Sequence, residues 1–269
     1  MKRILVTGSE GFIGSYLMEL IPEAIGFDLK SGQDIRDKQQ LASYLKGIDV
    51  VVHLAAQTSI ANAWDDPVNL YSHNILGTAN VIEESIKAGV KKIVFASSAS
   101  IYQPYDNPYS FSKYVCEGLF KTRKDEMQNI LLRFMNVYGK GQNPSYGTVI
   151  PTFYKGIKKG KINIYGDGTN TRDYIHVTDV AYAIKKAVEL DSSVKTTFMD
   201  IGTGIEVSVN KLAELFSKFM NKKTKIKYSP SRKERDLCVG DTERARNILG
   251  FKSIVKLEQG LKEIVKKGI

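Results

Sequence analysis

The sequence has little cysteine and no long apolar run. Its 269 residues include only two cysteines, Cys116 and Cys238, which provide no disulfide framework. Such cysteine usage fits a reducing compartment, so we expect a cytoplasmic protein. No apolar stretch approaches the roughly 20 residues of a membrane-spanning helix, and the first apolar run stops at Gly8 in a glycine-rich turn. We therefore expect neither a signal peptide nor a membrane partner.

Arginine is also scarce, although the net charge is +10. Only nine of the 39 basic residues are arginines, and the lysines are spread along the chain with short clusters at 155–159, 185–186 and 222–227. Nucleic-acid binding would favour a basic stripe with aromatic residues or a known module, and we find neither. We interpret the lysines as a solvated surface that could help to steer anionic substrates, and we expect no nucleic-acid partner.

Internal repeats and low-complexity segments are absent, and short apolar runs alternate instead with helical patterns. The apolar runs predict strands at 4–6, 24–28, 49–54, 92–96 and 129–134. The helical patterns lie at 11–20, 37–45, 67–87 and 109–124. Strands that alternate with helices indicate right-handed β-α-β units and a parallel sheet. The sequence therefore predicts an α/β protein with a doubly wound parallel sheet.

Three glycines follow the first expected strand in the motif GSEGFIG at residues 8–14. Glycines let backbone amides approach a pyrophosphate, and the N-terminus of the following helix favours its negative charge. The spacing alone is weak, but here a strand precedes it and a helix follows it. We therefore predict a dinucleotide site, in preference to a mere tight turn, with contacts from Gly8, Gly11, Phe12, Ile13 and Gly14.

Asp28 stands at the end of the second expected strand. An acidic residue at this place accepts hydrogen bonds from the adenosine ribose hydroxyls and repels a 2′-phosphate. The alternative is an ordinary surface aspartate at a strand end. The position favours the cofactor contact, and it favours NAD over NADP despite the nearby Lys30.

A lysine follows a tyrosine at the fourth position in the run YSFSK at 109–113, and the tyrosine stands eleven positions after Ser98. This spacing places Tyr109 and Lys113 on one face of a helix. A phenol has an ordinary pKa of about 10, and a fixed ammonium nearby lowers the pKa because it stabilises the phenolate. The pattern therefore predicts an acid or base for an alcohol or carbonyl group.

These motifs together resemble one family. The chain is similar, from residue 1 to about 250, to extended short-chain dehydrogenases/reductases of the NAD-dependent epimerase/dehydratase family, and most of all to nucleotide-sugar 4-epimerases. The other stretches that carry the resemblance are DIR at 34–36, HLAAQ at 53–57, NILGTAN at 74–80, SSASIY at 97–102, LRFMNVYG at 132–139 and residues 166–177.

The resemblance implies a Rossmann-type sheet with a smaller, mixed C-terminal substrate-binding lobe. Glycine, asparagine and proline crowd residues 139–147, and a second turn-rich cluster follows a short helix near 148–159. We expect the NAD-binding domain to comprise residues 1–140 and about 171–203. The nucleotide-sugar-binding lobe would then comprise about 141–170 and 204–269.

The resemblance also implies roles at the cofactor. Ser98 would bind the reacting sugar oxygen, Tyr109 would be the acid and base, and Lys113 would hold the nicotinamide ribose. The remaining cofactor contacts would be Asp34 and Ile35 at the adenine, Leu54, Ala55 and Ala56 along the pyrophosphate and ribose, and Asn74 as a support for water or backbone.

Four residues would contact the nucleotide part of the substrate if the resemblance holds. Asn136 would lie beneath the phosphates, Arg172 would pair with them, and Tyr165 would stack on the base. Arg232 would be a second phosphate clamp, a role for which Arg235 competes. Two alternatives remain open, since Tyr165 could be a core residue and Arg172 could cap a loop through its neighbour Asp173. No metal site is expected.

The residues after Ser98 limit the reaction. Dehydratases of the family carry an acidic pair there, whereas this chain has Ala99 and Ser100, so we do not expect 4,6-dehydration. We expect NAD-dependent 4-epimerisation of a UDP-hexose or UDP-N-acetylhexosamine through a 4-keto intermediate. The alternative is a 4-keto-6-deoxy nucleotide-sugar reductase that uses NAD(P)H. A non-catalytic dinucleotide sensor is disfavoured because Ser98, Tyr109 and Lys113 are all present.

Substrate identity and assembly are less sharply indicated. A UDP- or dTDP-sugar is expected, and the short link of ten residues between Ser98 and Tyr109 is unlike the longer loop of most relatives. Cys238 falls near a position where a small side chain would leave room for an N-acetyl group. Relatives dimerise through the helices that match 67–87 and 109–124, so we expect a homodimer.

Overall fold

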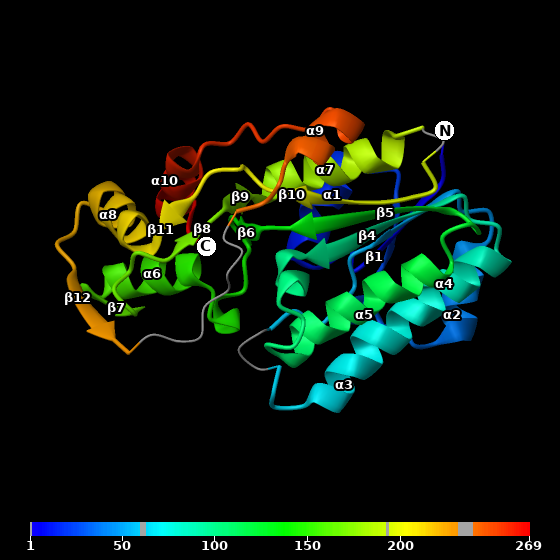
Figure 1. Cartoon of the computed structure of the whole chain (residues 1–269), viewed down its shortest axis with the longest axis horizontal. Helices are drawn as coiled ribbons and strands as arrows, with labels where there is room; N and C mark the ends of the chain where they lie inside the picture. The colour runs from blue at the N-terminus through cyan, green and yellow to red at the C-terminus, as the bar shows by residue number, and fades with distance from the viewer. Residues whose placement is uncertain (1, 60–62, 192–193, 231–238) are drawn as a thin grey trace.

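One parallel sheet lies between two layers of helices (Figure 1). The structure is a computed structural model that describes residues 2–59, 63–191, 194–230 and 239–269. The sheet has six strands in the order β10-β5-β4-β3-β1-β2, and all neighbouring pairs are parallel. The predicted α/β class with a Rossmann-type sheet is confirmed. The strands are β1 Ile4–Thr7, β2 Ile25–Phe27, β3 Val50–His53, β4 Lys92–Ser98, β5 Gln128–Phe134 and β10 Thr196–Ile201.

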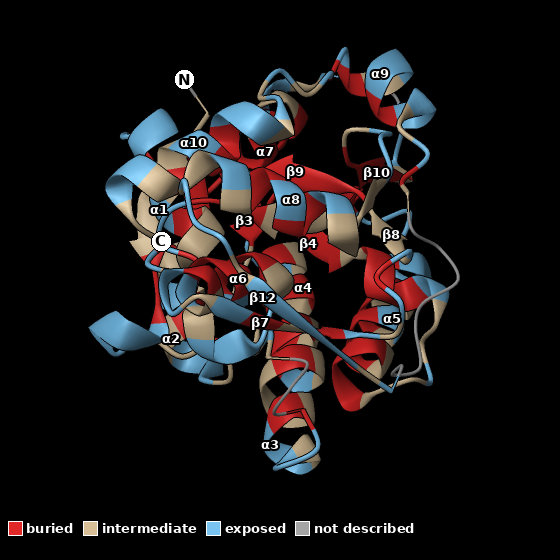
Figure 2. Cartoon of the chain, turned by 90° about the vertical axis from the view of Figure 1, so that its left-hand side faces the viewer, coloured by how far each residue is buried: buried red, intermediate tan, exposed pale blue. Residues whose placement is uncertain are grey.

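Alternate residues along the strands enter two separate apolar cores. Val52 and Val94 face the helices α1 and α7, whereas Val51 and Ile93 face α2, α4 and α5. Because both faces are covered, these strands are buried nearly throughout, as Figure 2 shows for β3 and β4. The covering helices are α1 Phe12–Leu20, α2 Lys38–Leu45, α4 Gly77–Lys87, α5 Pro108–Thr122 and α7 Val177–Glu189.

The direction in which the chain adds strands reverses at β1. The chain first places β2 on one side of β1 and then crosses to place β3 on the other side. Ligands of open α/β sheets bind at such a reversal, beside the carboxyl ends of the strands. Gly8 follows β1 and Leu54 follows β3, so both predicted cofactor segments lie at this point.

A smaller set of elements forms a third core beside the sheet, at the left of Figure 1. It contains two-stranded pairs, of which β12–β7 is parallel and β11–β8 is antiparallel. Helix α6 packs on β7, α8 packs on β11, and α10 packs on α8. The elements are α6 Val149–Lys158, β7 Lys161–Tyr165, β8 Thr171–Arg172, β11 Val207–Ser208, α8 Val209–Phe219, β12 Lys225–Ser229 and α10 Leu257–Lys267. The exact domain boundaries given above stay a prediction.

The long helix expected at 67–87 is interrupted. It consists of α3 Pro67–Tyr71, a π-helical turn Ser72–Leu76 and α4. A π turn widens the helix by one residue, and such turns are frequent at functional sites. The remaining elements of the described residues are β6 Asn136–Tyr138, β9 Tyr174–His176, α9 Glu243–Leu249 and three 3-10 turns at Leu29–Ser31, Ala99–Tyr102 and Pro144–Tyr146.

Candidate active site

A cavity of about 980 Å³ opens at the carboxyl ends of the central strands. Residues from both the large sheet and the smaller lobe line it. Its volume is at the upper end of the range of ligand pockets, roughly 300–1,000 Å³. Among the predicted site residues that the structure describes, all but Asn74 line this cavity.

The glycine motif forms a tight turn whose geometry only glycine allows. Gly8 has φ +76°, and a Cβ added there would lie 2.6 Å from the backbone nitrogen of Ala55. A Cβ on Gly14 would lie 2.1 Å from the carbonyl oxygen of Gly8. Gly11 is the N-cap of α1 and has no side chain to cover the first amides of the helix. These amides are thus open to an anion, which fits the pyrophosphate of a dinucleotide.

The carboxylate of Asp28 is held rigidly at the cavity wall. One of its oxygens accepts a hydrogen bond of 2.9 Å from the amide of Glu10 in the glycine motif. The other accepts a bond of 2.9 Å from the amide of Lys30. Each carboxylate oxygen can accept a further bond, so the group is orientated to receive two hydroxyls of a ribose.

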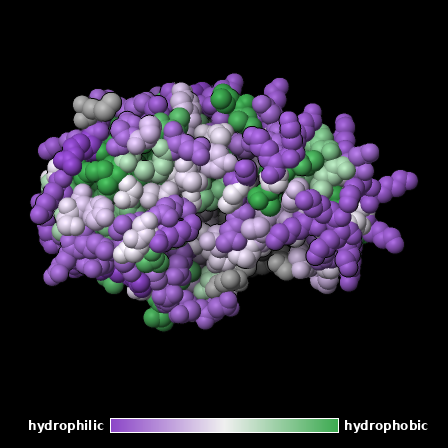
Figure 3. Space-filling model, turned by 180° about the vertical axis from the view of Figure 1, so that it is seen from behind, coloured by the Kyte–Doolittle hydropathy of each residue, from purple (hydrophilic) through white to green (hydrophobic). Residues whose placement is uncertain are grey.

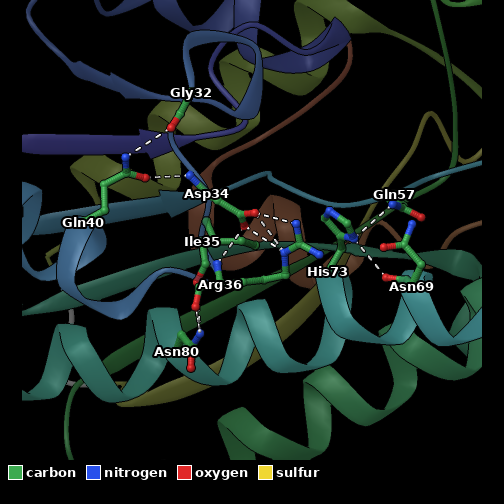
Figure 4. A network of polar contacts seen from close by, with 9 residues as sticks. All are labelled: Gly32, Asp34, Ile35, Arg36, Gln40, Gln57, Asn69, His73 and Asn80. Carbon is green, nitrogen blue, oxygen red and sulfur yellow. Dashed lines mark hydrogen bonds and ion pairs between the residues drawn. The ribbon is translucent and has the colours of Figure 1, made fainter.

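A second polar cluster lies at the adenine end predicted for the cofactor (Figure 4). Asp34 accepts two hydrogen bonds from Nε and one from Nη2 of Arg36, at 2.6–3.0 Å. These bonds hold the pKa of the Asp34 carboxyl below its ordinary value. The side-chain amide of Asn80 donates to the carbonyl oxygens of Ile35 and Arg36 and so fixes this segment to α4.

Two neighbouring residues of the π turn, His73 and Asn74, point their side chains in different directions. His73 lines the cavity, and its Nδ1 lies 2.9 Å from the carbonyl oxygen of Asn69 and 3.0 Å from Nε2 of Gln57 (Figure 4). Asn74 turns inward. Its side-chain oxygen accepts a hydrogen bond from the backbone N–H of Gln57, and its side-chain nitrogen donates to the carbonyl oxygen of Gln57 and to Oγ of Ser112. Asn74 is therefore placed to hold the backbone of Gln57 at the cavity wall.

The sequence places the tyrosine at the start of α5. The side chain of Asn107 caps the amide of Ser110, and Pro108 occupies the first turn, so the helix begins just before Tyr109. Tyr109 and Lys113 then follow each other on the face that lines the cavity, and Ser98 faces it from the end of β4. The three residues predicted to be catalytic therefore share one cavity wall.

Lys113 is deeply buried. Its Nζ donates a hydrogen bond of 2.8 Å to the carbonyl oxygen of Ala96 and lies 4.7 Å from the centroid of the Phe95 ring. Burial lowers the pKa of the Lys113 ammonium to about 8. The neighbouring His53 is also buried, between Thr7 and Thr78, and burial together with the charge of Lys113 lowers the pKa of its ring to about 3. His53 is thus a neutral packed residue.

The depressed pKa of Lys113 predicts a pH-dependent stability. An unfolded lysine has a pKa of about 10.4, so between pH 8 and that value the unfolded chain binds more protons than the folded one. The free energy of unfolding should therefore rise by about 3 kcal/mol over this interval, at ~1.4 kcal/mol for each pKa unit. Urea unfolding of the wild type and Lys113→Met at several pH values measures the difference, since all other groups titrate in both proteins. Parallel curves for the two proteins would contradict the expectation.

The residues predicted for the substrate line the same cavity. Tyr165 on β7 and Arg172 on β8 belong to the smaller lobe, and Asn136 stands two residues after β5. The amide of Asn136 donates to the carbonyl oxygen of Asp173, and the Asp173 carboxylate accepts from Thr203 and Gly204. Tyr165 is 39% exposed and so is not a core residue. Arg232, Arg235 and Cys238 lie outside the described residues.

Several cavity residues were not predicted. Glu10, Gln57, His73, Tyr146 and Asn163 also line the cavity. Glu10 and Gln57 belong to motifs that the sequence showed, so their place could have been foreseen. His73 could not, because the π turn that presents it has no signal in an ordinary helical pattern.

A family match over most of the sequence identifies the family of the chain. Residues 4–202 match the family described as NAD dependent epimerase/dehydratase. The chain belongs to this family. The predicted family and its cofactor, NAD, are thereby confirmed, and the chain is an enzyme by its membership.

Individual relatives show which activities occur among proteins of similar sequence. The UDP-glucose 4-epimerase of Bacillus subtilis is 28% identical, with 95% of this chain and 94% of the relative covered. A UDP-N-acetyl-alpha-D-glucosaminuronate decarboxylase of Bacillus cytotoxicus is 27% identical, with 98% and 97% covered. The structure of the Thermotoga maritima UDP-glucose 4-epimerase with UDP-glucose has a TM-score of 0.89 and 31% identity, and 98% of this chain and 97% of that chain are covered.

In the described part of the chain, no group of three or more His, Cys, Asp or Glu side chains could hold a metal ion. No helix in those ranges is both long and apolar enough to cross a membrane.

Proposed function

We propose that this chain is a UDP-sugar 4-epimerase that acts through a 4-keto sugar. The observation that carries the proposal is the wall shared by Ser98, Tyr109 and Lys113, in a cavity that the glycine turn and Asp28 also line. This wall brings an alcohol-activating phenol beside the site of a hydride acceptor. The similarity to UDP-glucose 4-epimerases over nearly the whole chain supports the same reaction.

The residues of the chain divide the work of the reaction. Tyr109 would take the proton from the sugar 4-hydroxyl and return it after the sugar has turned over, while Ser98 would hold the reacting oxygen. Buried Lys113 would fix the nicotinamide ribose and favour the phenolate of Tyr109. The chemistry that NAD supplies when bound is reversible hydride acceptance, which converts the carbon bearing the 4-hydroxyl to a ketone and back.

The far end of the cavity suits a nucleotide diphosphate. Arg172 would pair with its phosphates, because a guanidinium offers a fork of donors that matches phosphate oxygens. Asn136 would lie beneath the same phosphates, and half-exposed Tyr165 would stack on the base. UDP is favoured over dTDP by the substrates in the names of the relatives.

Incubation with a panel of UDP-, dTDP- and GDP-sugars, followed by NMR at the 4-position, tests the proposal. We expect two C4 epimers to interconvert without net consumption of added NAD. Three other outcomes would replace the epimerase assignment. Loss of reduced-nicotinamide absorbance on addition of a keto sugar indicates the reductase, CO₂ release from a UDP-hexuronic acid indicates a decarboxylase, and loss of water indicates a dehydratase despite Ala99 and Ser100.

We further propose that two copies of the chain associate through α3, α4 and α5, which pack beside one another (Figure 1). Large apolar side chains are exposed on α3 (Val68), on the π turn between α3 and α4 (Leu76), on the segment before α5 (Tyr105) and on α5 (Tyr114). Light scattering should give about twice the 30.0 kDa of one chain, and Val68→Glu with Leu76→Glu should halve that mass. A wild-type mass of one chain would refute the dimer.

A cytoplasmic location stays a prediction, to which the structure adds that Cys116 is a buried free thiol.

A further inference from the structure

Almost all of the net charge comes from two short stretches of the smaller lobe. Residues 149–165 and 215–229 contain nine lysines and no carboxylate, whereas the whole chain has a net charge of +10. The rest of the chain is therefore nearly neutral, with a net charge of +1. The nine residues, all exposed, are Lys155, Lys158, Lys159, Lys161, Lys218, Lys222, Lys223, Lys225 and Lys227.

The tertiary structure joins these two stretches. Strand β12 pairs with β7 in parallel, with Lys225 opposite Lys161 and Lys227 opposite Asn163. Nζ of Lys222 also donates to the carbonyl oxygen of Lys158. Lysines about 60 residues apart in sequence thus share one surface. Figure 3 shows hydrophilic side chains projecting at its right-hand end, on the side where this lobe lies.

Three of the lysines lie on the face of the strand pair that leads to the cavity. Alternate residues of a strand share one face, and Ile162 and Ile164 of β7 are buried in the core of the lobe. Residues 161, 163 and 165 therefore point to the opposite face, together with Lys225 and Lys227. Asn163 and Tyr165 on this face line the cavity, and Ile164 between them reaches it as well. We call Lys161, Lys225 and Lys227 the lysine ramp.

We propose that the lysine ramp steers the diphosphate of the nucleotide sugar into the cavity. The idea rests on the proposed function, because it takes a nucleotide diphosphate as the ligand. Both phosphates of such a ligand are ionised at neutral pH, and a surface of one charge sign beside a cleft raises the association rate of an oppositely charged ligand. The ramp would thus accelerate capture, whereas Arg172 and Asn136 would hold the bound phosphates.

The distance over which a charge acts before salt screens it determines which lysines contribute to the steering. Neighbouring strands are about 5 Å apart, and two residues along a strand span about 7 Å. Lys227 and Lys161 are therefore within about 8 Å of Asn163, and Lys225, which lies diagonally across, is within about 9 Å, close to one Debye length at physiological salt. Lys158, Lys159, Lys222 and Lys223 lie beyond the strand ends and should contribute only at low ionic strength.

The test is the association rate of a fluorescent UDP analogue, measured by stopped flow. In Lys161→Gln/Lys225→Gln/Lys227→Gln we expect the association rate constant to fall about tenfold in 10 mM salt. The deficit should shrink to less than about twofold in 0.5 M salt, where charges are screened beyond about 4 Å. The dissociation rate constant and kcat should be unchanged, since the ramp does not touch the bound ligand.

A matched triple variant separates position from net charge. Lys46→Gln/Lys91→Gln/Lys124→Gln removes the same charge from exposed sites, and Lys91 stands just before β4, at the opposite end of that strand from Ser98. This variant should associate at nearly the wild-type rate. Equal deficits in both triple variants, or none in the ramp variant, would overturn the proposal. A faster dissociation in the ramp variant would also overturn it, because the lysines would then be direct contacts.

The measurement is independent of turnover. UDP binds without reaction, so an enzyme that binds UDP by the ramp but epimerises no sugar would disprove the proposed function alone. Epimerisation that proceeds with an unaltered association rate in the ramp variant would disprove the ramp alone.

Discussion

Tyr109→Phe is expected to lower kcat/KM by about 10²- to 10⁴-fold, the usual contribution of a positioned acid or base. The change removes one oxygen from a side chain that is only 7% exposed and keeps the ring that packs against Ala63 and Leu70. The fold and the affinity for NAD should therefore remain close to those of the wild type. Steady-state kinetics with the substrate found in the panel, and titration with NAD, measure both quantities.

Tyr114→Phe is the matched control. Tyr114 lies on the same helix α5, but its side chain is 46% exposed and does not line the cavity. Loss of this phenol should change kcat/KM by less than about twofold, because it removes no group from the site. If Tyr109→Phe kept near-full activity while binding NAD normally, Tyr109 would not be the acid and base.

Glu117→Ala is expected to lower the free energy of unfolding by about 3–5 kcal/mol, the cost of breaking a buried ion pair. The carboxylate of Glu117 on α5 accepts hydrogen bonds from Nε and Nη2 of Arg133 on β5, at 2.9 and 2.8 Å. Both side chains are buried. Burial by itself lowers the pKa of the Arg133 guanidinium, but its hydrogen bonds to Glu117 raise the pKa overall. Removal of the carboxylate would leave this charge buried without its anionic partner, although Nη1 would still donate to the Tyr102 hydroxyl.

Glu83→Ala serves as the control for the ion pair. Glu83 pairs with Arg123 at 2.8 Å, but both side chains are 43% exposed, so its loss should cost no more than about 1 kcal/mol. Urea unfolding gives both values. A double variant, Glu117→Leu/Arg133→Met, should be less destabilised than Glu117→Ala, because it leaves no buried charge. A loss below 1 kcal/mol for Glu117→Ala would show that water reaches Arg133.

The Glu117 variant should also affect the site. Oγ of Ser97 donates to Glu117 at 2.7 Å, and Ser97 precedes Ser98 at the end of β4. This hydrogen bond therefore links α5, which carries Tyr109, to β4, which carries Ser98. The structure adds this link, since the sequence analysis assigned no role to either Glu117 or Arg133.

Local patterns were sufficient for the strands, the glycine turn and the start of α5. Short apolar runs that alternate with helical patterns favour the buried strands of a parallel sheet, and Asn107 followed by Pro108 is a typical start of a helix. The interruption of the 67–87 helix could not be predicted. A π turn changes the helix by a single residue, and its stabilisation comes from contacts of Asn74 with Gln57 and Ser112, which are distant in sequence.

The sequence by itself determined the family, the cofactor and the spacing that sets Tyr109 and Lys113 on one helix face, because each depends on residues a few positions apart. Only the tertiary structure decided which distant groups meet. It turned His73 toward the cavity, paired Glu117 with Arg133 and gathered dispersed lysines into a ramp beside Tyr165. The physical reason is that packing of buried apolar faces chooses neighbouring elements, and polar residues on the other faces are carried to positions that no local pattern encodes.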